Sequence, residues 1–291
     1  MRVIILGASG FLGAALFTRL SNDGIDVVGA GRGAPLEPGD VTDLSSLKTL
    51  FAEHTPDVIV NLAAAGVSPG FVDLARLTEV NRAGPQNVMN AMHSVASRAL
   101  LIHVSSSREI SNDGRKPATA YGQSKAEGTA LVLSEINNGE LNGLVVQLHN
   151  TYGATQPSSR LIQWVTTRAL SNQVIELRNP SAIRDFVYID DVVDALVSAI
   201  RVGTGSKPVF RSVNTCIPIG TGVGHPVIDV VHLVVERLNS RSMVITTQPN
   251  HDELQEPAVV IADPSLAKQV LGWNSRTHLT EGVSRTLKEL K

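Results

Sequence analysis

The chain has 291 residues, of which 43% are hydrophobic and 18% charged, and its formal net charge is −2 at pH 7. This length allows one large α/β domain, and the scattered charge excludes the basic footprint of a protein that binds nucleic acid or an anionic membrane surface. No uninterrupted apolar run reaches the length of a membrane span. The single cysteine, Cys216, reads as a small core residue, and no Cys/His spacing suits zinc. We therefore expect a cytoplasmic protein without a metal site.

Short β-branched runs alternate with stretches of helical period through the first half of the chain. The pattern predicts strands over 3–6, 26–30, 58–61, 100–105 and 144–148, and helices over 12–22, 44–53, 81–95 and 121–137. Continuous apolar strands separated by helices indicate an α/β fold with a Rossmann-like, doubly wound parallel sheet. We expect residues 1–153 to form this domain, joined by part of roughly 186–216.

The pattern changes after residue 153. Residues 153–159 read as a loop, followed by a helix over 161–170, a strand over 174–177 and a helix from about Asp190. The glycine-rich stretch 219–225 reads as another loop, and helices are expected over 227–239 and 280–290. Residues 154–291 should therefore form mainly a smaller C-terminal lobe, which we expect to bind the substrate.

Three glycines, Gly7, Gly10 and Gly13, lie between the first predicted strand and the first predicted helix. The unpaired N–H groups and positive end of a helix favour a phosphate group, and glycine lets a pyrophosphate approach the backbone. The spacing G-x-x-G-x-x-G differs from the generic fingerprint and is also compatible with a merely structural tight turn. Its place between strand and helix favours a dinucleotide site.

Gly31-Arg32 stands at the end of the second strand, where an NAD-binding protein carries a carboxylate for the ribose hydroxyls. An arginine can instead hold the additional phosphate of NADP with paired N–H donors. The sequence thus favours NADP, with NAD as the alternative; a solvated loop arginine is the other interpretation of Arg32.

Tyr121 and Lys125 are four residues apart in a predicted helix and so share one face. A cation near a phenol lowers its pKa, and we therefore expect Tyr121 to transfer protons near neutral pH. The serines of 105–107 end a predicted strand, where their hydroxyls could bind a substrate oxygen or simply form a loop.

Taken in order, these motifs resemble the extended short-chain dehydrogenase/reductase family, the NAD-dependent epimerase/dehydratase-like enzymes of nucleotide sugars. The resemblance continues through segments in both halves of the chain. The matching segments are Gly7-x-x-Gly10-x-x-Gly13, Gly39-Asp40-Val41-Thr42-Asp43, Asn61-Leu62-Ala63-Ala64, Ser105-Ser106-Ser107, Tyr121-x-x-x-Lys125, Asn150-Thr151-Tyr152-Gly153, Arg184-Asp185-Phe186, Ala262-Asp263-Pro264-Ser265 and Leu271-Gly272-Trp273.

The resemblance implies roles for individual residues. The catalytic set would be Ser107, Tyr121 and Lys125, and the substrate would meet Ser106, Asn150, Arg160 and Arg184. The NADP-binding set would be Gly7, Ser9, Gly10, Phe11, Leu12, Gly13, Arg32, Asp40, Val41, Leu62, Ala63 and Ala64, with Tyr121 and Lys125. For Arg184 the alternative is an exposed ion pair with Asp185 or another neighbour.

By the same resemblance we expect an NADPH-dependent reductase of a keto group on a nucleoside-diphosphate sugar, most concretely a 4-keto-6-deoxyhexose. A nucleotide-sugar epimerase with tightly bound NAD and a non-catalytic nucleotide sensor are the alternatives. Arg108-Glu109 replaces the Asp-Glu of dehydratases, Gln147 replaces a common arginine, and a turn is expected at Asn112-Asp113-Gly114. Relatives often pair through two helices, here 81–95 and 121–137, so we expect a homodimer.

Overall fold

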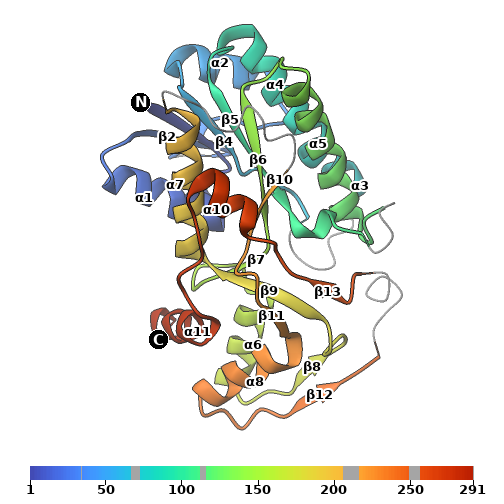
Figure 1. Cartoon of the computed structure of the whole chain (residues 1–291). Helices are drawn as coiled ribbons and strands as arrows, with labels where there is room; N and C mark the ends of the chain where they lie inside the picture. The colour runs from blue at the N-terminus through green and yellow to red at the C-terminus, as the bar shows by residue number, and fades with distance from the viewer. Residues whose placement is uncertain (34, 67–72, 112–115, 206–215, 249–255, 291) are drawn as a thin grey trace.

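The computed structural model describes residues 1–33, 35–66, 73–111, 116–205, 216–248 and 256–290. The turn expected at Asn112-Asp113-Gly114 lies outside the described residues. Figure 1 shows two lobes, one built around a large sheet and one around smaller sheets and helices. None of the helices in the described part of the chain is long and apolar enough to cross a membrane.

A seven-stranded sheet forms the centre of the first lobe. Its strands are β1 (Arg2–Leu6), β2 (Asp26–Gly31), β3 (Glu37–Pro38), β4 (Val58–Asn61), β5 (Leu100–Ser106), β6 (Gly143–Leu148) and β10 (Cys216–Ile219). They lie in the order β10-β6-β5-β4-β1-β2-β3, and all neighbours are parallel. The order reverses beside β1, where doubly wound folds bind ligands at the carboxyl ends of their strands. The predicted Rossmann-like sheet is confirmed.

Helices cover both faces of this sheet (Figure 1). One face carries α1 (Phe11–Asn22) and α7 (Ile189–Gly203), and the other carries α2 (Leu44–His54), α4 (Gly84–Val95) and α5 (Ala120–Asn137). Side chains alternate along β1 in the same way, since Val3 and Ile5 join the core on one side and Ile4 and Leu6 the core on the other. Burial on both faces explains why the strands read as continuous apolar runs.

The helix expected from residue 81 has a different beginning. A π-helical segment, Thr78–Ala83, follows the short α3 (Leu74–Leu77) and leads into α4 at Gly84. Pro85 stands in the first turn of α4, directly after the π-helical segment. The predicted dimer contact through α4 and α5 stays a prediction, as does the division into domains.

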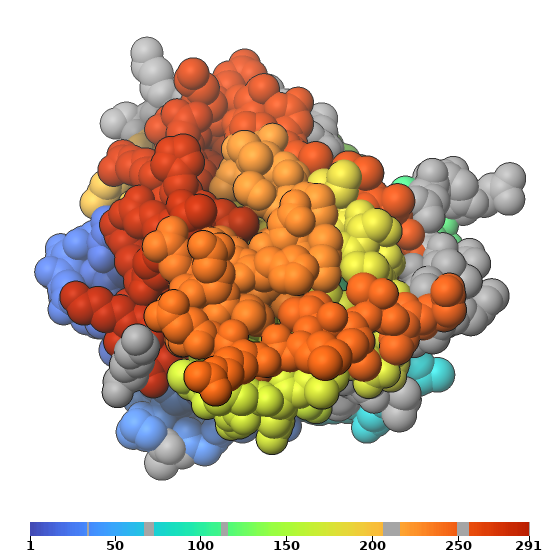
Figure 2. All heavy atoms as spheres, turned by 90° about the horizontal axis from the view of Figure 1, so that it is seen from below, coloured from blue at the N-terminus to red at the C-terminus, as the bar shows by residue number. Residues whose placement is uncertain are grey.

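Among the described residues, short strands and three helices form most of the second lobe, which Figure 2 shows from below. The strands β7 (Asn150–Tyr152), β11 (Gly224–Pro226) and β13 (Val259–Val260) pair with β9 (Ile183–Tyr188), and β8 (Ile175–Leu177) pairs with β12 (Val244–Thr246). The helices are α6 (Leu161–Leu170), α8 (Val227–Arg237) and α11 (Leu279–Glu289), whereas α10 (Ser265–Leu271) packs against α7 and β10 of the first lobe (Figure 1). The loop expected over 219–225 is shorter than predicted, because β10 ends at Ile219 and β11 begins at Gly224.

Candidate active site

The turn between β1 and α1 leaves no room for side chains at two of its glycines. Gly7 has φ +82°, and a Cβ there would lie 3.0 Å from the nitrogen of Ala63. A Cβ on Gly13 would lie 2.2 Å from the carbonyl oxygen of Gly7. Gly10 is the N-cap of α1 and places no side-chain acceptor over the first-turn N–H groups. Backbone access and a positive helix end therefore fit the pyrophosphate of a dinucleotide.

Other residues predicted to bind the cofactor lie around this turn. Ser9, Phe11 and Leu12 flank Gly10 at the start of α1. The segment Leu62–Ala64 follows β4, where the Leu62 N–H donates to Leu6 O at 3.0 Å and brings its backbone against Gly7. The glycine turn and the exit of β4 thus form one continuous surface at the carboxyl edge of the sheet.

Asn81, predicted from the sequence only as the start of a helix, stabilises this surface through side-chain hydrogen bonds. Its Oδ1 accepts from Ala65 N at 2.9 Å, and its Nδ2 donates to Ala65 O at 3.0 Å and to Ser124 Oγ at 2.9 Å. Asn81 is 1% exposed. It therefore connects the segment after β4 to the helix that carries Tyr121 and Lys125. Burial is the sign that this asparagine has a structural role, and no local sequence pattern reveals it.

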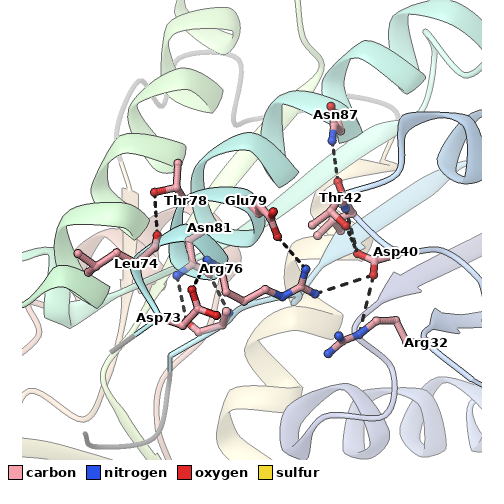
Figure 3. A network of polar contacts seen from close by, with 12 residues as sticks. Arg32, Asp40, Thr42, Asp73, Leu74, Arg76, Thr78, Glu79, Asn81 and Asn87 are labelled. Carbon is pink, nitrogen blue, oxygen red and sulfur yellow. Dashed lines mark hydrogen bonds and ion pairs between the residues drawn. The ribbon is translucent and has the colours of Figure 1, made fainter. Parts of the chain in front are cut away.

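Two arginines meet at Asp40, beyond the end of β2 (Figure 3). Arg32 Nε and Arg76 Nη2 each lie 3.9 Å from Asp40 Oδ2. Burial raises the pKa of Asp40, but hydrogen bonds from Thr42 and the charges of Arg76 and Arg32 outweigh it and hold this pKa below its usual value. The side chain of Arg32 is 74% exposed. Arg76, which no motif of the sequence singles out, reaches this site from α3 and also pairs with Glu79 at 3.1 Å.

Val41, the neighbour of Asp40, is buried and its carbonyl accepts from Asn87 Nδ2 at 2.9 Å. This bond anchors the segment after β3 to α4, so the Asp40 carboxylate stands on a fixed backbone (Figure 3). The structure thus brings Arg32, Asp40 and Val41 to one place, and their contact with a cofactor stays a prediction.

The end of β5 and the start of α5 hold the predicted catalytic residues. Thr119 caps α5 by accepting from Gly122 N at 3.0 Å, so Tyr121 and Lys125 lie one turn apart at its beginning. The Lys125 ammonium is buried and donates to Val104 O, near the end of β5, at 2.7 Å. Gly122 lets the helix approach this strand end, because a Cβ there would lie 2.2 Å from Arg108 O.

The three serines have different positions. Ser105 and Ser106 complete β5, whereas Ser107 opens the 3₁₀ turn Ser107–Glu109. Ser107 is buried and lines a cavity of the cleft between the lobes. Ser106 caps the 3₁₀ turn and hydrogen-bonds to Tyr121, which lowers the pKa of that phenol.

The net effect on Tyr121 is opposite to the one expected. Burial raises the pKa of Tyr121, and the nearby Glu109 charge adds to this; Ser106 and the charges of Arg160 and Arg108 oppose it without prevailing. Burial also lowers the pKa of Lys125, against the influence of Glu109 and Cys216. The prediction that the lysine charge makes this phenol more acidic is therefore wrong, because desolvation dominates.

The cavity that Ser107 lines also contains Arg108, Asn150, Arg184 and Glu256. Arg184 is 9% exposed and donates to Glu256 Oε2 at 3.2 Å and to Pro257 O at 2.9 Å. Arg108 forms a second ion pair with Glu256. The alternative of an exposed pair with Asp185 is wrong, since Arg184 is buried and its guanidinium bonds to the segment just before β13, which pairs with β9. Glu256 was not singled out from the sequence.

Asp185 has a structural task of its own. Its carboxylate is 1% exposed and accepts from Thr221 N and Gly222 N, both at 2.9 Å. These bonds hold the loop between β10 and β11 against β9.

Arg160, also expected to bind substrate, is the N-cap residue of α6, and its charge acts on Tyr121 and Arg108. Arg160 therefore lies on the side of the cleft that faces the tyrosine.

Known proteins resemble this chain along almost its whole length. The model of the NAD dependent epimerase/dehydratase family matches residues 3–210. The chain is 27% identical to dTDP-6-deoxy-L-talose 4-dehydrogenase (NAD(P)(+)) of Kitasatospora kifunensis, covering 97% of this chain and 93% of that protein. It is 27% identical to UDP-glucose 4-epimerase of Mycolicibacterium smegmatis, covering 99% and 97%. The structure of MoeE5 in complex with UDP-glucuronic acid and NAD is 26% identical, with a TM-score of 0.82 over 99% of this chain and 98% of that one.

Proposed function

Because the chain belongs to the NAD-dependent epimerase/dehydratase family, we propose that it is an NADPH-dependent reductase of a keto group on a nucleoside-diphosphate sugar. A 4-keto-6-deoxyhexose is the favoured substrate, and a 4-dehydrogenase of a deoxy sugar among the relatives supports this choice. The observation that carries the proposal is the meeting of Tyr121, Lys125 and the serines at the end of β5, beside a glycine turn shaped for a dinucleotide.

The chemistry assigns a task to each side chain. The cofactor supplies the hydride when bound, and Tyr121 supplies the proton that turns the keto oxygen into a hydroxyl. Burial raises the pKa of Tyr121 and keeps its phenol protonated, which is the form that a proton donor needs. Ser107 lines the cleft and would donate a hydrogen bond to the same oxygen, while Asn150 and Arg184 would hold the remainder of the substrate.

Cofactor choice rests on the cations near Asp40. A phosphate on the adenosine ribose would meet the exposed guanidinium of Arg32, with Arg76 close by on the other side of the carboxylate. Loss of a charge-assisted contact of this kind costs about 1.5–3 kcal/mol. We expect Arg32→Ala to weaken NADPH binding about tenfold or more while NADH binding changes little, as measured by calorimetry.

Arg98→Ala is the matched control, because Arg98 is an exposed arginine at the opposite end of β5 from this site. It should leave the affinities for both cofactors unchanged. Equal losses of NADPH and NADH affinity in Arg32→Ala would remove the basis for NADP.

Activity is tested with a panel of keto-sugar nucleotides, following NADPH absorbance. Tyr121→Phe keeps the ring but removes the hydroxyl, and it should lower kcat by about 10²-fold or more. A demonstrated reduction that survives this substitution unchanged would refute the proton-transfer role.

A nucleotide-sugar epimerase with retained NAD is the second candidate, and the M. smegmatis relative supports it. The nucleotide released from the freshly purified protein distinguishes the two. Tightly bound NAD with no response to added NADPH favours the epimerase, whereas dependence on added NADPH favours the reductase. A protein that binds nucleotide but turns over no keto sugar would instead be the non-catalytic sensor of the same fold.

A further inference from the structure

Two charged side chains bond to the backbone of β5 beyond the point where its neighbour β4 ends. Leu100 N donates to Asp57 O on the β4 side and Leu101 N donates to Asn142 O on the β6 side, each at 2.9 Å. Because the direction of backbone groups alternates along a strand, the polar groups of Val104 and Ser106 also face the β4 side. The pairing of β4 with β5 ends at His103, so these groups lie past the last residue of β4.

Lys125 and Glu109 take over these two backbone groups. Lys125 Nζ donates to Val104 O at 2.7 Å, and Glu109 Oε1 accepts from Ser106 N at 2.9 Å. In a parallel ladder one residue of the neighbouring strand would bond both of these groups. The ammonium and the carboxylate therefore stand side by side in the place of a single strand residue.

Glu109 is partly buried and does not line the cavity of the substrate cleft. The cleft cavity is lined by Ser107, Arg108 and Ile110, the residues on either side of Glu109 in the chain, but not by Glu109 itself. Lys125, next to it, is 3% exposed. A buried ammonium is costly without a nearby counter-charge, and Glu109 provides one on the protein side of the site.

We propose that Glu109 is a positioning residue for Lys125, acting as the internal counter-ion that holds the ammonium against the end of β5. The inference rests on the proposed function only in that Lys125 and Tyr121 are taken as the catalytic pair. It assigns the charge opposite Lys125 to a residue of the 3₁₀ turn after β5, independent of which sugar enters the cleft.

Several charged or titratable groups face this pair, and they set the direction of the expected effect. Lys125 of α5 and Cys216 of β10 face Glu109. Buried His103 also faces Lys125, and Glu109, Arg108 and Arg160 face Tyr121. Burial raises the pKa of Tyr121, and the Glu109 charge raises it further. Neutralising Glu109 must therefore lower the pKa of Tyr121.

Glu109→Gln is the decisive variant, because the amide oxygen can still accept from Ser106 N while the charge is removed. The ionisation of Tyr121 is followed by tyrosinate absorbance as the difference between each protein and its Tyr121→Phe counterpart. The chain has three tyrosines, and burial raises the pKa of Tyr188 to about 12 and that of Tyr152 as well, so the difference isolates Tyr121. The midpoint should shift to lower pH in Glu109→Gln.

Glu127→Gln is the matched control, since Glu127 is an exposed residue of the same helix that pairs with Arg82. It should leave the Tyr121 midpoint where it is in the unmodified protein. An unchanged midpoint in Glu109→Gln, or an equal shift in the control, would overturn the inference.

A double-mutant cycle covers the case in which Glu109→Gln fails to fold. Lys125→Met removes the ammonium that the first change leaves without a counter-ion, so the double variant should be more stable than the two single losses predict. Additive losses, or no recovery of folding, contradict the pairing. Neither measurement needs a substrate: a shifted midpoint without reductase activity refutes the proposed function alone.

Discussion

Gly13→Ala tests whether the glycine turn is the cofactor platform. The added methyl would lie 2.2 Å from the carbonyl oxygen of Gly7 and 2.8 Å from the Cα of Ala8, both of which are backbone atoms. Neither can rotate away, so α1 must move outward from the turn. Overpacking of this kind costs about 1–3 kcal/mol. If the displacement acts on the bound state, the affinity for NADPH should fall about 5- to 150-fold.

The assay is calorimetric titration with NADPH alongside a thermal melt, because the strain can lower stability as well as affinity. Gly205→Ala is the control, since a Cβ there meets its nearest atoms at 3.5 Å, an ordinary contact. A Gly13→Ala protein that binds NADPH and melts like the unmodified chain would show that α1 does not pack on this turn, and the dinucleotide site would have to lie elsewhere.

Four further substitutions have expected effects of defined direction. Ser106→Ala should move the ionisation of Tyr121 to higher pH, because the Ser106 hydrogen bond lowers that pKa, whereas Ser107→Ala should lower kcat without moving it. His103 has a pKa well below its usual value because it is buried, so the unfolded chain takes up a proton near pH 6.5 that the folded chain refuses. The free energy of unfolding should therefore fall as the pH drops below about 6.5, and less in His103→Asn, by denaturant titration. Asp185→Asn should lower the free energy of unfolding by about 2 kcal/mol, because a buried acceptor of backbone N–H groups is replaced by an amide that also needs acceptors.

Local patterns predicted the first lobe because its strands are buried on both faces and its helices have a regular apolar period. The helix over 161–170 agrees with α6 for the same reason. Strands β7, β11 and β13 have three, three and two residues, too few for any period to show. They exist because each pairs with β9, a contact that no window of the sequence contains.

The candidate site also contains residues that local patterns predict and residues that only distant pairing brings together. The placement of Gly7 and Gly13 in one turn, and of Tyr121 and Lys125 on one helix, could be predicted because each pair is set by a spacing of a few residues. Glu256 could not, since its partner Arg184 stands 72 positions earlier and the two meet only through the folding of the second lobe. Substrate contacts depend on such distant pairs, which is why the sequence indicates the reaction class more sharply than the sugar.

The acidity of Tyr121 shows where spacing stops being informative. Two residues four apart on a helix are neighbours, and the structure keeps Tyr121 and Lys125 so. A cation lowers the pKa of a phenol only where its field is not compensated and the phenol is not desolvated. Here Lys125 is directed at Val104 O with Glu109 beside it, and the cations that act on Tyr121 are Arg160 and Arg108. The direction of the Tyr121 pKa shift is therefore set by burial and by residues of the turn after β5. Neither can be inferred from the helix that carries the motif.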